Sequence, residues 1–71
     1  MSASNIIKKI MLDKKISVKD LAEKLNIKPQ VLSNKLYRDT FTYNDYIKIV
    51  NVLECDVKTI SRDGLIEYTN E

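Results

Sequence analysis

Residues 17–36 decide the fold of this chain, and they read SVKDLAEKLNIKPQVLSNKL. Apolar residues recur three or four positions apart on both sides of one short break, which predicts two helices joined by a turn. Asn26 ends the first helix because asparagine tolerates the left-handed backbone conformation, and Pro29 suits the first turn of the second. Ala22 is small where the second helix crosses closely, and Leu32 holds that helix at a steep angle. The pattern predicts a helix that is supported on one side and exposed on the other.

One further helix is expected on each side of this pair. Ser4 can cap a first helix that runs to about Lys14. Thr42 and Asp45 form a capping box, so a last helix should run from about residue 43 to residue 53 or 54. The predicted core, with Met11 as a further candidate, consists of Ile7, Ile10, Leu21, Ala22, Leu25, Val31, Leu32, Leu36, Tyr46, Ile49, Val50 and Leu53.

The C-terminal residues 57–68 have a different pattern. They are rich in β-branched residues and contain Asp63-Gly64, a strong signal for a two-residue hairpin turn. Such a turn pairs Arg62 with Leu65, Ser61 with Ile66 and Thr59 with Tyr68. Because an isolated hairpin is marginal in water, it should pack on the helices or on a partner chain. A short fifth helix over residues 57–61 is the competing interpretation.

Length and composition indicate one globular domain over residues 1–71. Hydrophobic residues make up 44% of the chain and charged residues 31%, which is not the composition of a disordered protein. The predicted helical core spans residues 4–55, and the C-terminal extension spans residues 56–71. We therefore predict an all-α bundle of four helices, or five, with a short C-terminal β-hairpin.

The net charge of +2 conceals an asymmetry along the chain. Residues 1–38 carry nine Lys and Arg against three Asp and Glu, which gives +6. Residues 39–71 carry three basic residues against seven acidic ones, which gives −4. A polyanion is attracted to the first half and repelled by the second, as in a nucleic-acid-binding surface.

The residue types that are missing argue against several functions. The chain has one cysteine, Cys55, and no histidine, so it offers no internal disulfide, no zinc site and no histidine general base. A single glycine rules out a glycine-rich phosphate loop. We expect a protein that is not an enzyme, uses no metal or cofactor, does not span a membrane and lies in the cytoplasm, where a lone thiol stays reduced.

Residues 21–33 carry a resemblance to a known family. Leu21-Ala22-x-x-Leu25-Asn26-Ile27 followed by Ser33 resembles the Cro/repressor type of helix-turn-helix regulators, which have the lambda-repressor-like fold. The resemblance covers roughly residues 5–57, and the flanking apolar residues that agree are Ile7, Ile10, Ile16, Ile49 and Leu53. It implies that the third helix recognises double-stranded DNA and that a two-fold dimer binds a pseudo-palindromic operator.

The resemblance assigns roles to individual residues. The base-contacting residues would be Pro29, Gln30, Ser33 and Asn34. The phosphate-contacting residues would be Val18, Lys19, Lys28, Lys35, Arg38, Thr42 and Tyr43. Val18 stands where the family commonly has a glutamine, and Gln30 can read adenine through N6 and N7. Tyr37 is expected either to cover the edge of the core, which is the favoured interpretation, or to contact the DNA backbone.

The C-terminal extension is similar to the β extensions through which some small members of the family pair. The expected dimerisation residues are Val57, Ile60, Ile66 and Tyr68.

Together these observations favour a transcriptional regulator, and more narrowly a repressor of phage, plasmid or mobile-element type that blocks a promoter. The alternative is a protein-interaction module on the same scaffold, such as an antitoxin or an inhibitor of a host defence enzyme. The modest net charge and the apolar Val18 favour this alternative.

Overall fold

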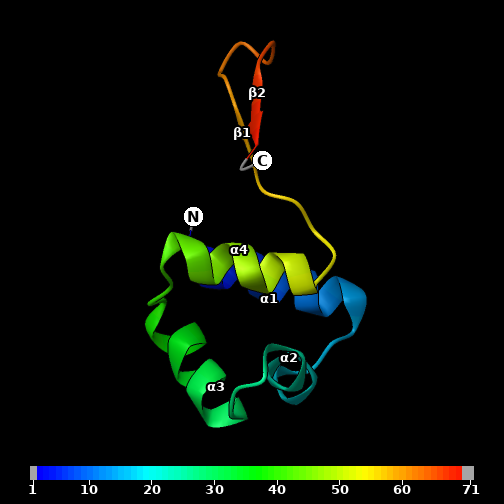
Figure 1. The fold of residues 1–71 in the computed structure, drawn as a ribbon, viewed down its shortest axis with the longest axis vertical. Coiled ribbons are helices and arrows are strands. Elements are labelled where there is room, and N and C mark those ends of the chain that lie inside the picture. The colour runs from blue at the N-terminus through cyan, green and yellow to red at the C-terminus, as the bar shows by residue number, and fades with distance from the viewer. Residues whose placement is uncertain (1, 70–71) are drawn as a thin grey trace.

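A computed structural model describes residues 2–69, which form four helices followed by a two-stranded antiparallel sheet (Figure 1). In chain order the elements are α1 (Ala3–Lys14), α2 (Val18–Leu25), α3 (Pro29–Arg38), α4 (Tyr43–Val52), β1 (Lys58–Ile60) and β2 (Glu67–Thr69). The predicted four-helix bundle with a C-terminal hairpin is confirmed. Residues 58–60 are a strand, so the alternative of a fifth helix over residues 57–61 is wrong.

The N-terminus of α1 differs from the prediction because Ser4 has another role. Ser2 caps the helix, and its hydroxyl accepts a hydrogen bond from the Asn5 N–H at 3.1 Å. Ser4 is buried, donates its hydroxyl to the Leu36 carbonyl at 2.8 Å and donates its N–H to the Asp39 carboxylate at 2.9 Å. Ser4 therefore ties the start of α1 to the end of α3.

The other predicted helix boundaries are close to those observed. Ser17 caps α2 by accepting from the Asp20 N–H, and Thr42 and Asp45 form the predicted capping box of α4. Asn26 ends α2 in the left-handed conformation, with φ 58°. The next N–H, from Ile27, bonds back to the Ala22 carbonyl at 3.0 Å, which completes a Schellman-type end.

The core lies where the four helices meet. Its buried apolar residues are Ile7, Met11, Leu21, Ala22, Leu32, Leu36, Ile49, Val50 and Leu53. Of the other predicted core residues, Ile10, Leu25 and Tyr46 pack against this cluster and are partly buried. Val31 is the exception: 42% of it is exposed, since it lies about 100° around the helix axis from Leu32.

The hairpin has the predicted register but a wider turn. Thr59 pairs with Tyr68, and the Ser61 N–H donates to the Ile66 carbonyl at 2.9 Å. Gly64 donates its N–H to the Ser61 carbonyl at 2.9 Å, so residues 62–65 form the loop and the predicted pair of Arg62 with Leu65 is wrong. The tight turn needs positive φ at both central residues, but only Gly64 has it, because the Asp63 carboxylate instead accepts from the Leu65 N–H.

The hairpin extends away from the helices beyond α4 (Figure 1). Within residues 2–69, β1 and β2 contact each other and none of the helices, and the molecule measures 40 × 22 × 21 Å. Every residue of the two strands is exposed. The sequence analysis expected the hairpin to pack either on the helices or on a partner chain. The hairpin does not pack on the helices. In the described part of the chain, no helix has the length and apolar character needed to cross a bilayer.

Candidate nucleic-acid interface

One side of α3 is fixed by burial, which leaves the opposite side free. Leu32 is fully buried and Leu36 nearly so, and α3 packs against α1 and α2 through this side. The turn at Asn26 sets the angle between α2 and α3. A helix held this way presents its outer face to solvent, and its width suits the major groove of DNA.

The four predicted base-contacting residues lie together on the exposed part of α3. Pro29, Gln30, Ser33 and Asn34 are all exposed. The Gln30 amide nitrogen donates to the Asn34 amide oxygen at 3.4 Å across one helical turn. The pair leaves the Gln30 amide oxygen, one Gln30 N–H and both N–H groups of Asn34 free, and an amide oxygen with an amide N–H is the combination that adenine N6 and N7 require.

The N-terminus of α3 is electrostatically open. Lys28 occupies the cap position but makes no side-chain hydrogen bond to the first turn. The first turn of a helix carries unpaired N–H groups and the positive end of the helix dipole, so it attracts anions. Lys28 and Lys19 are exposed near the starts of α3 and α2, and Arg38 is exposed at the end of α3.

Two predicted phosphate-contacting residues have other structural roles. Val18 is partly buried against the core, so only its backbone N–H at the start of α2 is available to a phosphate. The Lys35 ammonium lies 3.5 Å from Asp45 Oδ2 in a half-exposed ion pair between α3 and α4. The structure therefore places the Lys35 charge beside α4 and away from the Gln30 face.

Thr42 and Tyr43 lie at the start of α4. The Thr42 hydroxyl accepts from the Asp45 N–H at 3.1 Å and keeps its own hydrogen available for a phosphate. Its backbone N–H donates to the Asp45 carboxylate at 3.3 Å, a hydrogen bond that lowers the pKa of Asp45, with Lys35 adding to the effect. Tyr43 is exposed beside this cap.

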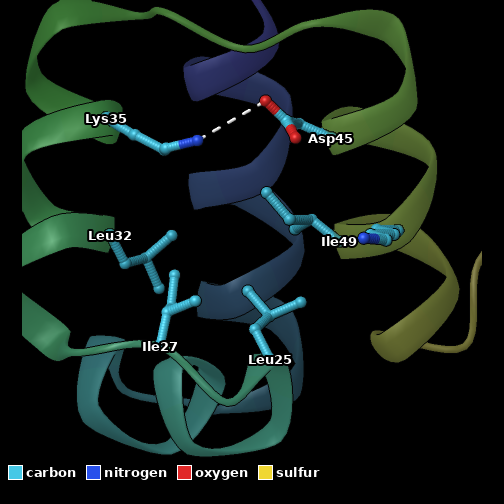
Figure 2. Close-up of a pocket in the computed structure, with 7 residues that line it drawn as sticks. Leu25, Ile27, Leu32, Lys35, Asp45 and Ile49 are labelled. Atoms are coloured by element: carbon cyan, nitrogen blue, oxygen red, sulfur yellow. Dashed lines mark hydrogen bonds and ion pairs between the residues drawn. The ribbon is translucent and has the colours of Figure 1, made fainter.

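A small pocket of about 130 Å³ lies between α2, α3 and α4 (Figure 2). Apolar side chains from α2, the turn, α3 and α4 line it, namely Leu25, Ile27, Leu32 and Ile49, with Lys35, Asp45 and Lys48 at its polar side. Figure 2 shows Lys35 and Asp45 pointing toward each other across the space that separates α3 from α4. Their ion pair is thus a direct contact between these two helices.

Two residues of the exposed face were expected at the core or its edge. Tyr37 is 88% exposed, so its favoured role at the core edge is wrong, and its contact with the DNA backbone stays a prediction. It lies seven residues after Gln30 and three after Asn34, which places all three on one side of the helix. Val31 also lies on the exposed side. Helical spacing counted from Leu32 and Leu36 is the signal that identifies both residues.

The predicted dimerisation residues divide between the two faces of the hairpin. Opposed residues share a face and neighbours along a strand alternate. The pairing of Thr59 with Tyr68 and of Ile60 with Glu67 puts Tyr68 and Ile60 on opposite faces. Ile66 shares the face of Tyr68, whereas Val57 precedes β1 and is partly buried.

A comparison with known protein families matches most of the chain. The family model for the Cro/C1-type helix-turn-helix DNA-binding domain matches residues 6–62, which include all of α2 to α4 and the strand β1. No curated protein and no solved structure matches the chain significantly. With the turn at Asn26 and the exposed face of α3, this match shows that the chain belongs to the family of Cro/C1-type helix-turn-helix DNA-binding domains.

Proposed function

We propose that this DNA-binding protein is a sequence-specific transcriptional repressor of phage, plasmid or mobile-element type that acts as a homodimer on a pseudo-palindromic operator. The observation that carries the proposal is the exposed amide pair of Gln30 and Asn34 on a helix whose opposite face is buried. A rigid support and free amide groups are the two requirements for reading bases in the major groove.

Gln30 reads an adenine, and Asn34 holds the Gln30 amide in position while it contacts a neighbouring base or phosphate. The carboxamide of Gln30 can accept from N6–H and donate to N7 of the same adenine. Asn34 accepts one of the two amide hydrogens of Gln30, which restricts its rotation before DNA binds. Pro29 and Ser33 lie together on one side of this pair and contact the base edges there.

Phosphate contacts fix the orientation of α3 in the groove. Lys19 and Lys28 bind phosphates near the starts of α2 and α3, and Arg38 binds one near the end of α3. Thr42 and Tyr43 bind the DNA backbone at the start of α4, and the Val18 N–H donates to a phosphate. These contacts supply affinity without sequence information and make binding depend on salt.

A second copy of the chain covers the hairpin. Its strands are three residues long and make no contact with the helices within residues 2–69, yet the hairpin exposes Ile60, Ile66 and Tyr68. A two-stranded sheet of this kind is marginal in water unless further apolar surface is buried. Two operator half-sites require two copies of α3 about one helical turn of DNA apart, and pairing of two hairpins is the proposed link between those copies.

Repression follows from occupancy. A dimer bound across an operator that overlaps a promoter excludes the polymerase from the same DNA. The proposal needs no catalytic group or effector, and it uses the exposed face of α3, the starts of α2 and α4, and the hairpin.

Selection from a pool of random DNA duplexes at physiological salt tests the proposal. The expected result is an enriched inverted repeat with half-sites about one helical turn apart. Affinity for the enriched duplex should fall with rising salt, with a logarithmic slope of about −0.9 for each phosphate neutralised. Asn51→Ala, which removes an exposed amide on α4, is the matched control and should select the same repeat as the wild type.

The alternative function predicts a different result in the same experiment. If no sequence is enriched and the weak retention disappears as salt rises, the proposal is wrong. The scaffold then serves protein interaction, for which the exposed hairpin is the available surface.

A further inference from the structure

Val31 is an apolar side chain that the fold leaves in solvent on the outer side of α3. It is 42% exposed, whereas its neighbour Leu32 is fully buried. It belongs neither to the buried core nor to the partly buried residues that pack against it. Val31 also costs helix stability relative to alanine, because a β-branched side chain loses rotamer freedom in a helix. Packing and helix propensity therefore leave its presence at this position unexplained.

The position of Val31 connects it to the amide pair. It follows Gln30 directly in the first turn of α3 and lies three residues before Asn34. Consecutive helical residues diverge by about 100° and rise by about 1.5 Å, so side chains at positions 30 and 31 reach neighbouring base pairs or opposite strands of one base pair. Val31 is exposed beside Gln30, so an apolar group at position 31 is within reach of base edges in the groove that Gln30 enters.

We infer that Val31 contacts the C5 methyl group of a thymine that lies beside the adenine read by Gln30. This inference rests on the proposed operator binding and specifies one part of it. Thymine is the base that presents a methyl group in the major groove, and apolar side chains recognise it by burying that methyl from water. Gln30 supplies hydrogen bonds to the adenine, and Val31 supplies an apolar contact to the thymine. The half-site is therefore expected to contain these two bases side by side, with no G·C pair at either position.

Replacement of thymine by uracil isolates this contact, because it removes the methyl group and changes no hydrogen bond of the base pair. The enriched operator is made with each thymine of the half-site replaced in turn, and binding of the full-length protein is measured. At one position the wild type should bind the uracil duplex about fourfold more weakly, the factor expected from burial of one methyl group. Val31→Ala should bind the thymine and uracil duplexes equally at that position.

Two further variants make the result specific. Leu12→Ala removes an exposed aliphatic side chain from α1 and should keep the wild-type ratio between thymine and uracil duplexes. Val31→Thr keeps the side-chain shape but replaces one methyl group with a hydroxyl, and it should give an intermediate ratio. Helical circular dichroism confirms that each variant is folded.

The outcomes separate this inference from the proposed function. If the wild type binds the operator specifically but tolerates uracil at every position, or if Val31→Ala keeps the discrimination, Val31 does not read a thymine while operator binding stands. If no duplex is bound specifically, the proposed function fails and the inference fails with it.

Discussion

The helical body and the hairpin are stabilised in different ways. The body, residues 2–55, buries nine apolar side chains where four helices meet. The hairpin, residues 57–69, is held by its cross-strand hydrogen bonds, by the Lys58–Glu67 ion pair at 3.1 Å and by the local bonds of Asp63 in its loop. Exposed ion pairs contribute little to stability, and a lone hairpin is marginal. The body therefore specifies its own fold, whereas the hairpin should depend on a second copy.

Deletion of residues 57–71 should have the largest effect on function. Without the hairpin the body should remain helical but monomeric, and operator affinity should fall by about 10²–10⁴-fold because the two half-sites are no longer bound by one linked pair. Analytical ultracentrifugation and operator titration measure the two effects. A truncated chain that still dimerises and binds normally would contradict the role of the hairpin.

Point variants show which face of the hairpin pairs. Tyr68→Lys places a charge on the face that also carries Ile66, and Ile60→Lys places the same charge on the opposite face. We expect the first to abolish the dimer and the second to weaken it less, because only the first face offers two apolar residues within the strands and their inner ends. The reverse order would assign the interface to the face of Ile60.

Disruption of the body should affect folding itself. Leu32→Ala removes a fully buried side chain between α3 and the rest of the core and should cost about 2–5 kcal/mol, a large part of the total stability of a small domain. The matched variant Leu12→Ala truncates a leucine that is 80% exposed on α1 and should change the free energy of unfolding by less than about 0.5 kcal/mol. Urea denaturation measures both, and similar effects at the two positions would refute the assigned core.

The sequence predicted those features that local chemistry decides. Asn26 and Pro29 mark the turn and the start of α3 by their backbone preferences, and the Thr42 capping box starts α4. The register of Thr59 with Tyr68 follows from the position of the only glycine. These are effects between residues close in sequence, so a single chain is sufficient to reveal them.

The features that were missed depend on contacts that local patterns do not contain. Ser4 is not a cap because it bonds to Leu36 and Asp39 at the far end of α3. Lys35 is paired with Asp45 across a cavity, which no spacing rule indicates. Val31 is different, since its exposure follows from helical geometry once Leu32 and Leu36 are known to be buried.

Loss of the Gln30 amide should have a smaller and more local effect than loss of the core. Gln30→Ala should weaken operator binding by about 1–3 kcal/mol and relax selectivity at one base pair, while binding to random DNA stays unchanged. Asn34→Ala should relax the same position in part, because it removes the partner of the Gln30 amide. Competition with operators changed at single base pairs measures both, and unchanged selectivity in Gln30→Ala would contradict the docking of α3.

The smallest expected effect is a difference between the helical body and the hairpin in how their stability depends on pH. The Ser4 N–H donates to Asp39 and holds the pKa of that carboxyl below its ordinary value of 3.8. In the hairpin, the Ser61 hydroxyl donates to Asp63 and lowers the pKa of that carboxyl. A carboxyl with a lowered pKa in the folded state contributes stability above pH 3.8, and this contribution is lost as the pH falls toward the lowered value.

Asp39, at the end of α3, accepts a hydrogen bond from Ser4 at the start of α1, so it contributes to the free energy of unfolding of the whole helical body. Asp63 bonds only residues of the hairpin loop, and the hairpin does not contact the helices. Asp39→Asn should therefore reduce the loss of helical stability between neutral pH and pH 3, while asparagine still accepts the left-handed conformation at position 39. Asp63→Asn should leave this loss of helical stability between neutral pH and pH 3 unchanged. The comparison is made in a Tyr68→Lys background, where the hairpin does not pair with a second copy. Thermal unfolding followed at helical wavelengths over this pH range measures the difference, and equal effects of the two substitutions would mean that the hairpin and the body unfold as one unit.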